Sequence, residues 1–152
     1  MSLENANDLK VIVFQLAEEE YGVPVGQVRS IEKVQHITRV PKSVGFVKGV
    51  LNLRGVVTPI IDLRIRFGLK EIDYTDSTRI IIVTLENMEV GLIVDAANDV
   101  LDISNDSIEP PPKVVGVVEA DYLKGVIKVG KRLLILLNLE SVLNVDELEI
   151  RR

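Results

Sequence analysis

The sequence contains no cysteine and a single histidine, His36. Without cysteine, the chain cannot form disulfides, thiolate zinc sites or a cysteine nucleophile. A single histidine cannot build a multi-histidine metal site, and His36 lies in no triad motif with a serine. There is also no Gly-x-Gly-x-x-Gly or Walker-type phosphate loop. We therefore expect no metal, no cofactor and no enzymatic activity.

Aromatic residues make up only 4% of the chain, whereas hydrophobic residues make up 47%. The core must therefore be aliphatic, and its bias toward Val and Ile favours strands. Apolar runs such as 133–137 are far shorter than the roughly 20 residues that span a bilayer. The formal charge is -5 without a long basic run, which disfavours nucleic acid as a partner. The polar, acidic residues 1–8 are unlike a signal peptide, so we expect a soluble cytoplasmic protein without direct membrane insertion.

The chain contains an internal repeat. Residues 48–63 match residues 124–139 without a gap, and residues 11–25 match residues 80–94. The spacing between the copies is larger for the later match, and the proline-rich loop 109–113 can absorb the extra residues. These matches predict one duplication, with a first half to about residue 78 and a second half from about 79 to 143.

Each half has the same predicted order of strands. The predicted strands are 10–16, 21–25, 47–53 and 56–61 in the first half, and 79–85, 88–94, 122–129 and 132–137 in the second. Gly55 and Gly130 supply turn positions that favour positive φ, and Asp62 and Asn138 are suited to cap short helices. The stretch 25–33 fits either a helix or a strand. Short strands repeated in this way predict two small antiparallel barrels that share an apolar interface.

Asn52 and Arg54 distinguish the first hairpin from its repeat, because the position of Arg54 is Gly130 in the second copy. An arginine at a hairpin tip can make bidentate, charge-assisted hydrogen bonds to a partner. From its spacing alone, Arg54 fits a solvated turn residue equally well, and the contrast with Gly130 in the second copy stands against that interpretation. Gly49 and Gly55 would allow another molecule to approach closely, although turn or bulge geometry explains both glycines equally well.

Five segments carry a resemblance to a known family. They are Glu20-Tyr-Gly22, Phe46-Val-Lys-Gly-Val50, Asn52-Leu-Arg-Gly-Val-Val-Thr-Pro-Ile-Ile-Asp-Leu-Arg64, Val90-Gly-Leu-Ile-Val-Asp95 and Leu133-Leu-Ile-Leu-Leu-Asn138. In these segments and in the repeat layout, the chain resembles the CheW family of chemotaxis coupling proteins. The similarity covers nearly the whole chain, so it implies a single CheW-like domain over residues 1–152.

The resemblance implies a mainly β fold of two five-stranded antiparallel SH3-like barrels. They would pack on a shared apolar core, with short helices and with terminal strands that the barrels can exchange. It also implies a non-enzymatic adaptor between the cytoplasmic hairpin tips of methyl-accepting chemoreceptors and the regulatory domain of the histidine kinase CheA. Two alternatives are the CheW-like part of a receiver-fused coupling protein and a scaffold for a chemosensory system unrelated to motility. Since the sequence ends at Arg152 without room for a receiver, a longer reading frame would favour the first alternative.

The resemblance also implies binding residues. The predicted receptor-binding residues are Val28, Ser30, Gly49, Asn52, Arg54 and Gly55. The predicted kinase-binding residues are Gly91, Ile93 and Val94. A family glutamate that pairs with the arginine falls at position 30, where this sequence has Ser30. We therefore expect Arg54 either to pair with Glu32 or to remain free.

Overall fold

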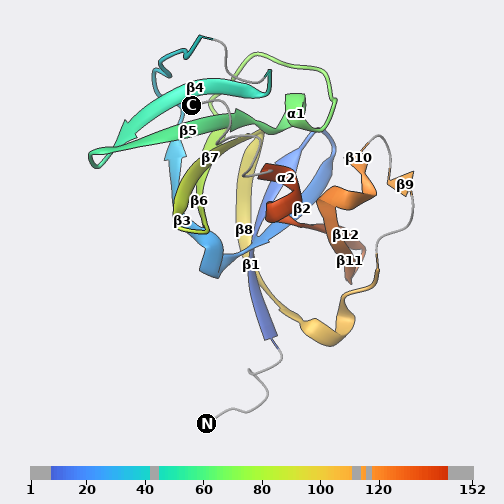
Figure 1. Ribbon diagram of the computed structural model, residues 1–152. Coiled ribbons are helices and arrows are strands. Elements are labelled where there is room, and N and C mark those ends of the chain that lie inside the picture. Colours follow the sequence, from blue (N-terminus) through green and yellow to red (C-terminus); the bar gives the residue numbers. More distant parts are fainter. Residues whose placement is uncertain (1–7, 42–44, 111–113, 116–117, 144–152) are drawn as a thin grey trace.

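The computed structural model describes residues 8–41, 45–110, 114–115 and 118–143, and most of them lie in two five-stranded sheets (Figure 1). The first sheet has the order β3 (Val28–Lys33), β6 (Arg79–Leu85), β7 (Met88–Val94), β5 (Val56–Asp62) and β4 (Val47–Leu53). The second sheet has the order β11 (Leu123–Val129), β12 (Arg132–Leu137), β2 (Glu19–Pro24), β1 (Asp8–Leu16) and β8 (Ala96–Ser104). A short ladder joins β9 (Val114–Val115) to β10 (Val118–Glu119).

Short helical turns connect the strands. They are η2 (Val25–Gln27), α1 (Leu63–Arg66), η3 (Asn105–Ser107), η4 (Ala120–Tyr122) and α2 (Leu139–Leu143). Asp62 caps α1 as predicted, because its side chain accepts hydrogen bonds from the backbone N–H groups of Arg64 at 2.9 Å and Ile65 at 3.4 Å. The stretch 25–33 is one 3-10 turn followed by β3, which decides between the two structures that its sequence allowed. Of the proline run 110–112, residues 111–112 lie outside the described residues.

Each sheet contains strands from both halves of the duplicated sequence. In the second sheet β2 pairs with β12 in parallel, and in the first sheet β5 pairs with β7 in parallel. The chain therefore passes between the sheets after β2 and after β7, away from the repeat boundary near residues 78–79. The strand pattern had suggested antiparallel pairing throughout. The parallel ladders arise because hairpins from different halves of the chain meet edge to edge.

Three buried apolar clusters form the core among the described residues. The largest lies between the two sheets and draws on both, with Phe14 and Tyr21 from the second sheet and Ile81 and Leu92 from the first. Each sheet also encloses a smaller cluster of its own. In β1, Phe14 faces the shared cluster while Val13 faces the interior of the second sheet, because side chains alternate along a strand. Each fully buried aliphatic or aromatic side chain contributes roughly 1.5–3 kcal/mol.

Within the described residues, the helices are too short to cross a membrane. The longest of them, α2, has only five residues.

Candidate functional site

Arg54 lies at the tip of the β4–β5 hairpin in a left-handed backbone conformation. Its φ is 54° and that of Gly55 is 81°, which is the pattern of a two-residue type I′ turn. The side chain of Asn52 stabilises this turn, because its Oδ1 accepts a hydrogen bond from the Gly55 N–H at 3.1 Å. Gly130, at the position of Arg54 in the second copy, also has a positive φ, of 62°. The three predicted residues Asn52, Arg54 and Gly55 are thus together at one tip.

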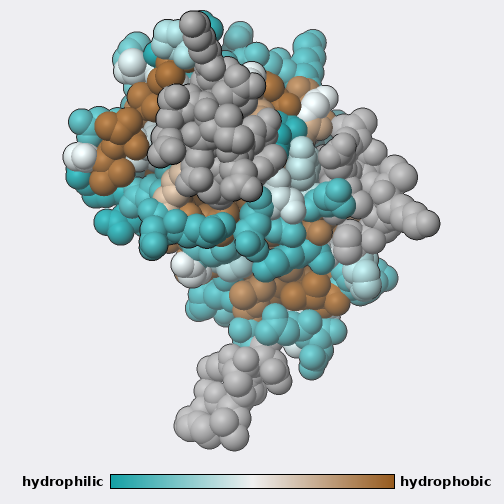
Figure 2. All heavy atoms as spheres, in the orientation of Figure 1, coloured by the Kyte–Doolittle hydropathy of each residue, from teal (hydrophilic) through white to brown (hydrophobic). Residues whose placement is uncertain are grey.

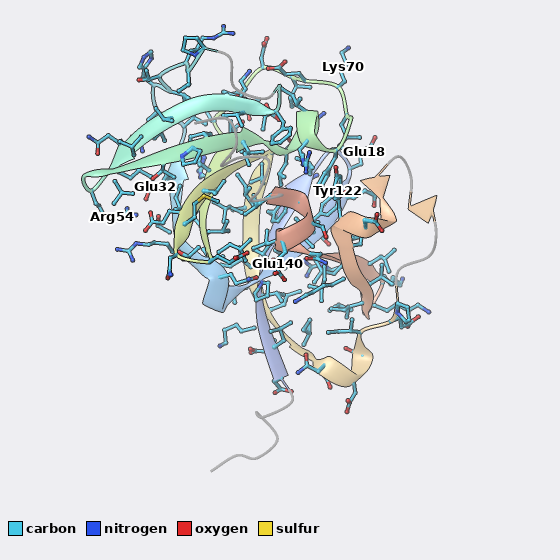
Figure 3. All side chains as sticks on the ribbon, viewed as in Figure 1. Glu18, Glu32, Arg54, Lys70, Tyr122 and Glu140 are labelled. Atoms are coloured by element: carbon cyan, nitrogen blue, oxygen red, sulfur yellow. The ribbon has the colours of Figure 1, made fainter. Side chains whose placement is uncertain are left out.

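Two carboxylates from different strands surround the Arg54 guanidinium. Nη1 lies 3.6 Å from Oε2 of Glu32 on β3, and Nη2 lies 3.6 Å from Oε1 of Glu89 on β7. Glu89 also contacts a second arginine, because its Oε2 lies 3.3 Å from Nε of Arg29. Figure 3 shows Arg54 and Glu32 close together beside the hairpin tip. We call Arg29, Glu32, Arg54 and Glu89 the Arg54 cluster; of the two states expected for Arg54, the structure shows the pair with Glu32.

Ser30 lies on the same face of β3 as Glu32, since alternate side chains of a strand share a face. Its Oγ is buried and has no hydrogen-bond partner among the described residues, and the same holds for Oε1 of Glu89. Val28 is partly buried and packs against the shared apolar cluster. Ser30 therefore lies in the strand that bears Glu32 but forms no hydrogen bond with Arg54.

Gly49 is required by the packing of the backbone. A Cβ at this position would lie 2.1 Å from the carbonyl oxygen of Thr38, and the φ of Gly49 is +150°. The close approach follows from a bridge in which Thr38 and Val50 exchange backbone hydrogen bonds of 3.0 and 2.8 Å. In the second copy a Cβ on Gly125 would likewise lie 2.6 Å from the carbonyl oxygen of Glu109. Gly49 is buried, and its contacts support the structural interpretation of this glycine.

The residues predicted to contact the kinase are buried. Ile93 is 4% exposed and Val94 1%, and both pack in apolar clusters. A Cβ on Gly91 would lie 2.6 Å from Cδ1 of Ile60 and 2.8 Å from Cγ2 of Ile80, both inside the first sheet. These three side-chain positions therefore offer no surface to a partner.

The second hairpin carries a comparable cluster with tighter geometry. Arg132, at the start of β12, donates two hydrogen bonds of 3.0 Å to Glu20, and its Nη2 lies 3.6 Å from Asp99. The hydrogen bond to Glu20 raises the pKa of Arg132. In the internal repeat, Glu20 corresponds to Glu89 and Asp99 corresponds to Ser30. The second copy thus holds its arginine through hydrogen bonds, whereas the first holds Arg54 through longer ion pairs.

Exposed apolar side chains adjoin the first hairpin tip. Val56 is 44% exposed and Val57 66%, and Figure 2 shows hydrophobic surface along the β4–β5 hairpin. Ile31 on β3 is 41% exposed. Apolar surface beside polar anchors is typical of a protein-binding surface. This end of the first sheet therefore combines exposed apolar side chains with the charged Arg54 cluster.

Comparison with known proteins identifies the family. A model described as "CheW-like domain" matches residues 10–147. The chain is 44% identical over 146 residues to chemotaxis protein CheW of Bacillus subtilis (strain 168), covering 96% of this chain and 94% of that protein. The chain belongs to the CheW-like domain family.

Other CheW proteins agree with this assignment. Chemotaxis protein CheW of Klebsiella aerogenes is 36% identical over 139 residues, which cover 91% of this chain and 84% of that protein. The crystal structure of scaffolding protein TtCheW from Thermoanaerobacter tengcongensis superposes with a TM-score of 0.82 at 38% identity, covering 88% of this chain and 86% of that one. The predicted fold of two SH3-like barrels on a shared apolar core is confirmed. As a CheW-like protein the chain is a chemotaxis adaptor or scaffold, from a family without catalytic activity.

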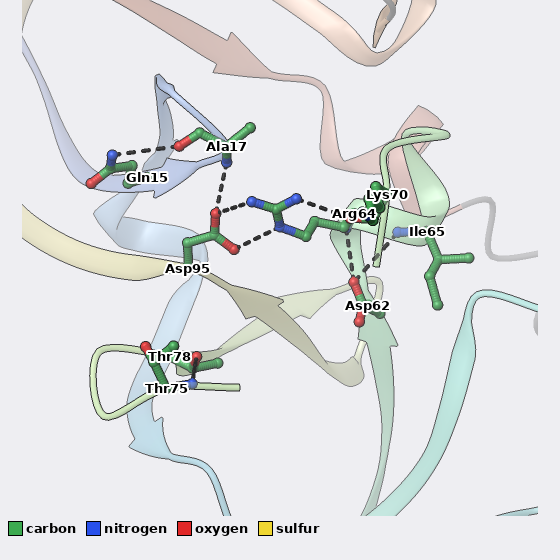
Figure 4. A network of polar contacts seen from close by, with 9 residues as sticks. All are labelled: Gln15, Ala17, Asp62, Arg64, Ile65, Lys70, Thr75, Thr78 and Asp95. Atoms are coloured by element: carbon green, nitrogen blue, oxygen red, sulfur yellow. Dashed lines mark hydrogen bonds and ion pairs between the residues drawn. The ribbon is translucent and has the colours of Figure 1, made fainter. Parts of the chain in front are cut away.

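In this CheW-like domain a bidentate ion pair joins the two sheets (Figure 4). Arg64 of α1 donates to Asp95 from Nε at 3.0 Å and from Nη2 at 2.7 Å, and this pairing raises the pKa of Arg64. Asp95 connects β7 to β8, and its Oδ2 also accepts a hydrogen bond of 2.7 Å from the backbone N–H of Ala17. Arg64 donates a further bond of 2.9 Å to the carbonyl oxygen of Lys70. These contacts, which we call the Arg64 network, connect the first sheet to the turn between β1 and β2 of the second sheet.

Arg66 makes a second connection between the sheets. Its Nε donates a hydrogen bond of 2.6 Å to the carbonyl oxygen of Val142 in α2. Its guanidinium carbon lies 4.2 Å from the centre of the Phe46 ring and 5.2 Å from that of the Tyr122 ring. The planar group therefore combines a cation–π contact with a cap on the end of α2.

Several of these residues were missed by reasoning from the sequence. Glu89 and Arg29 were assigned no role, although both belong to the Arg54 cluster. One signal was present, since Glu89 is the repeat counterpart of Glu20 and an acidic residue occurs at this position in both halves. Nothing comparable in the sequence marks Arg29.

Proposed function

We propose that the chain is a non-enzymatic adaptor that acts in the cytoplasm and couples the tips of methyl-accepting chemoreceptors to the regulatory domain of CheA. The observation that carries this proposal is the Arg54 hairpin tip of a CheW-like domain. There a 42% exposed arginine, held by carboxylates, stands beside the exposed apolar Val56 and Val57.

A helical receptor tip suits this surface. Amphipathic helices bind where an apolar strip adjoins a few polar anchors, and Arg54 can serve as such an anchor. Binding alone transmits the signal, because a receptor that changes the arrangement of the bound kinase shifts the populations of its active and inactive states.

An adaptor also needs a surface for its second partner. Val100, 50% exposed, and Leu133, 47% exposed, are the repeat counterparts of Ile31 and Val57. The duplication therefore supplies exposed apolar residues on the second sheet as well as on the first. We place the kinase contact on surface residues of this kind rather than on the buried Gly91, Ile93 and Val94.

The test is reconstitution with purified components. A chemoreceptor cytoplasmic fragment and CheA are sedimented with and without the protein, and kinase activity is measured in parallel. We expect the kinase to pellet with the receptor, and its activity to respond to the receptor, only when the protein is present. Kinase activity that does not depend on adding the protein would refute the coupling role.

A substitution of Arg54 tests whether the hairpin tip makes the receptor contact. Arg54→Ala should weaken binding to the receptor fragment while leaving the unfolding curve cooperative. Lys131→Ala, which removes an exposed cation from the tip of the second hairpin, is the matched control and should bind receptor like the wild type. Normal receptor binding by Arg54→Ala would remove Arg54 from the receptor surface.

A further inference from the structure

Two carboxylates compensate the positive charge of the Arg54 guanidinium, but among the described residues the guanidinium donates no hydrogen bond. Its contacts to Glu32 and Glu89 are both 3.6 Å long, beyond hydrogen-bond distance, whereas Arg132 donates two bonds of 3.0 Å to Glu20. No hydrogen bond to the Arg54 guanidinium is present within the described residues. Its N–H groups are therefore available to an acceptor that a partner supplies.

The charge around Arg54 limits what that acceptor is. The Arg54 cluster contains two arginines and two glutamates, so its formal charge is already zero. A partner carboxylate would enter beside Glu32 and Glu89, and like charges at such distances repel. A neutral oxygen accepts the same hydrogen bonds from Arg54 without that repulsion.

The same site also has acceptors without donors. Oε1 of Glu89 lies 3.6 Å from Nη2 of Arg54, is buried, and has no hydrogen-bond partner among the described residues. The buried Oγ of Ser30 likewise has none in this part of the chain. A group that donates as well as accepts would satisfy more of this cluster than an acceptor alone.

We propose that the Arg54 cluster is a specificity site for a carboxamide side chain, that of Asn or Gln, on the helical partner. This inference rests on the proposed function and specifies the chemistry of its receptor contact. A carboxamide has one acceptor oxygen and two N–H donors on one planar group. Its oxygen accepts from Arg54, and its N–H donates to Oε1 of Glu89 as Arg54 turns toward the partner. Glu89 is thus a second polar contact for the partner, and Arg29 keeps its other oxygen paired.

The first experiment measures the affinity for a chemoreceptor cytoplasmic fragment at about 50 mM and about 500 mM salt, a range over which exposed charge–charge attraction is strongly screened. Arg54→Asn keeps a residue that tolerates positive φ, and we expect it to bind roughly tenfold or more weakly at both salt concentrations. Arg54→Lys keeps the charge but not the planar fork, and should lose nearly as much. Lys131→Ala is the control for a lost surface cation.

Glu89→Gln distinguishes a carboxamide on the partner from a carboxylate. If the partner supplies a carboxamide, this variant loses the charged acceptor and binds several-fold more weakly. If the partner supplies a carboxylate, the variant removes a repulsion and binds more tightly, and the loss in Arg54→Asn shrinks at high salt. Either of these latter results would overturn the proposal.

The second experiment locates the partner group. Each Asn and Gln at the hairpin tip of the receptor fragment is replaced in turn by Asp or Glu. One replacement should weaken binding to the wild type but not to Arg54→Asn, which is the signature of a direct pair. If no replacement does so, the carboxamide assignment is wrong while the coupling function stands. If the wild type binds no receptor fragment at all, the proposed function fails and this inference fails with it.

Discussion

Glu89 extends from β7 to the tip of the β4–β5 hairpin, where its Oε1 lies 3.6 Å from Nη2 of Arg54. Its repeat counterpart, Glu20 on β2, accepts two hydrogen bonds from Arg132 of the neighbouring hairpin. An acidic residue at one position of the duplicated fold thus holds an arginine in both copies. The two arginines are similarly exposed, at 42% for Arg54 and 39% for Arg132, and they differ in that only Arg132 is hydrogen-bonded to its glutamate.

Ser30→Ala should leave stability unchanged or raise the free energy of unfolding by up to about 1 kcal/mol. The reason is that the substitution removes a buried hydroxyl oxygen that has no hydrogen-bond partner among the described residues. Denaturant unfolding measures the change. Thr58→Val is the control, because its buried hydroxyl donates a bond of 3.3 Å to the carbonyl oxygen of Val56, and it should lose about 1 kcal/mol. A clear loss of stability in Ser30→Ala would show that Oγ is bonded.

Gly49→Ala should destabilise the fold by about 2 kcal/mol or more. A Cβ here meets the carbonyl oxygen of Thr38 at 2.1 Å, on a backbone with φ of +150°. Gly26→Ala is the control, since no atom lies within 4 Å of its Cβ position, and it should change stability little. The measurement is the denaturant midpoint at constant slope. If Gly49→Ala were as stable as the wild type but bound receptor poorly, this glycine would belong to the binding surface instead.

Much of the fold was predictable because its signals are local. The repeated short apolar segments and the turn at Gly55 predicted β4 and β5 to within a residue, and Asp62 marked the start of α1. The exchange of strands between the two barrels was implied only by the family resemblance and not by local signals. The packing of the shared core decides which hairpin edges pair with each other, and the local sequence pattern does not encode this pairing.

The binding site was predictable only in part. The turn residues Asn52, Arg54 and Gly55 lie together because a two-residue hairpin fixes their geometry. Glu89 comes from a strand of the other sequence half, so only the exchanged topology brings it to Arg54. Gly91 was misleading because a glycine suited to a surface contact is equally suited to the close packing inside a sheet.

The Arg64 network should contribute measurably to stability. Arg64→Ala and Asp95→Ala should each cost about 1–3 kcal/mol, because each leaves charged or hydrogen-bonding groups of a largely buried pair unmatched. In a double-mutant cycle we expect the two losses to be strongly non-additive. Lys10→Ala is the control, since Lys10 and Asp102 are 60% and 67% exposed and such pairs contribute little. Additive losses would show that Arg64 and Asp95 act independently.

Asp62 should make stability depend on pH. Burial raises the pKa of its carboxyl above the ordinary value of 3.8, against the lowering effect of hydrogen bonds from the backbone N–H groups of Ile65 and Arg64. Because the folded protein then holds this proton more tightly than the unfolded chain, the contribution to stability is present below the unfolded pKa and is lost as pH rises through the folded pKa. Asp62→Asn keeps a capping oxygen but cannot ionise. Its free energy of unfolding should fall less than that of the wild type as pH rises from about 4; parallel pH curves would contradict the assignment.

Arg54→Gly should change the free energy of unfolding by less than about 1 kcal/mol while abolishing most receptor binding. Glycine removes the cost of a left-handed backbone at φ of 54°, which is about 1–2 kcal/mol. Against this stand the greater entropy of glycine in the unfolded chain and the loss of two partly exposed ion pairs, each a fraction of a kcal/mol. The second copy already has a glycine here, since Gly130 occupies the same turn position with φ of 62°.

Arg132→Ala, which removes two direct hydrogen bonds, should be more destabilising than Arg54→Gly. A stability loss in Arg54→Gly that exceeds the loss in Arg132→Ala would show that Arg54 supports the fold rather than a partner.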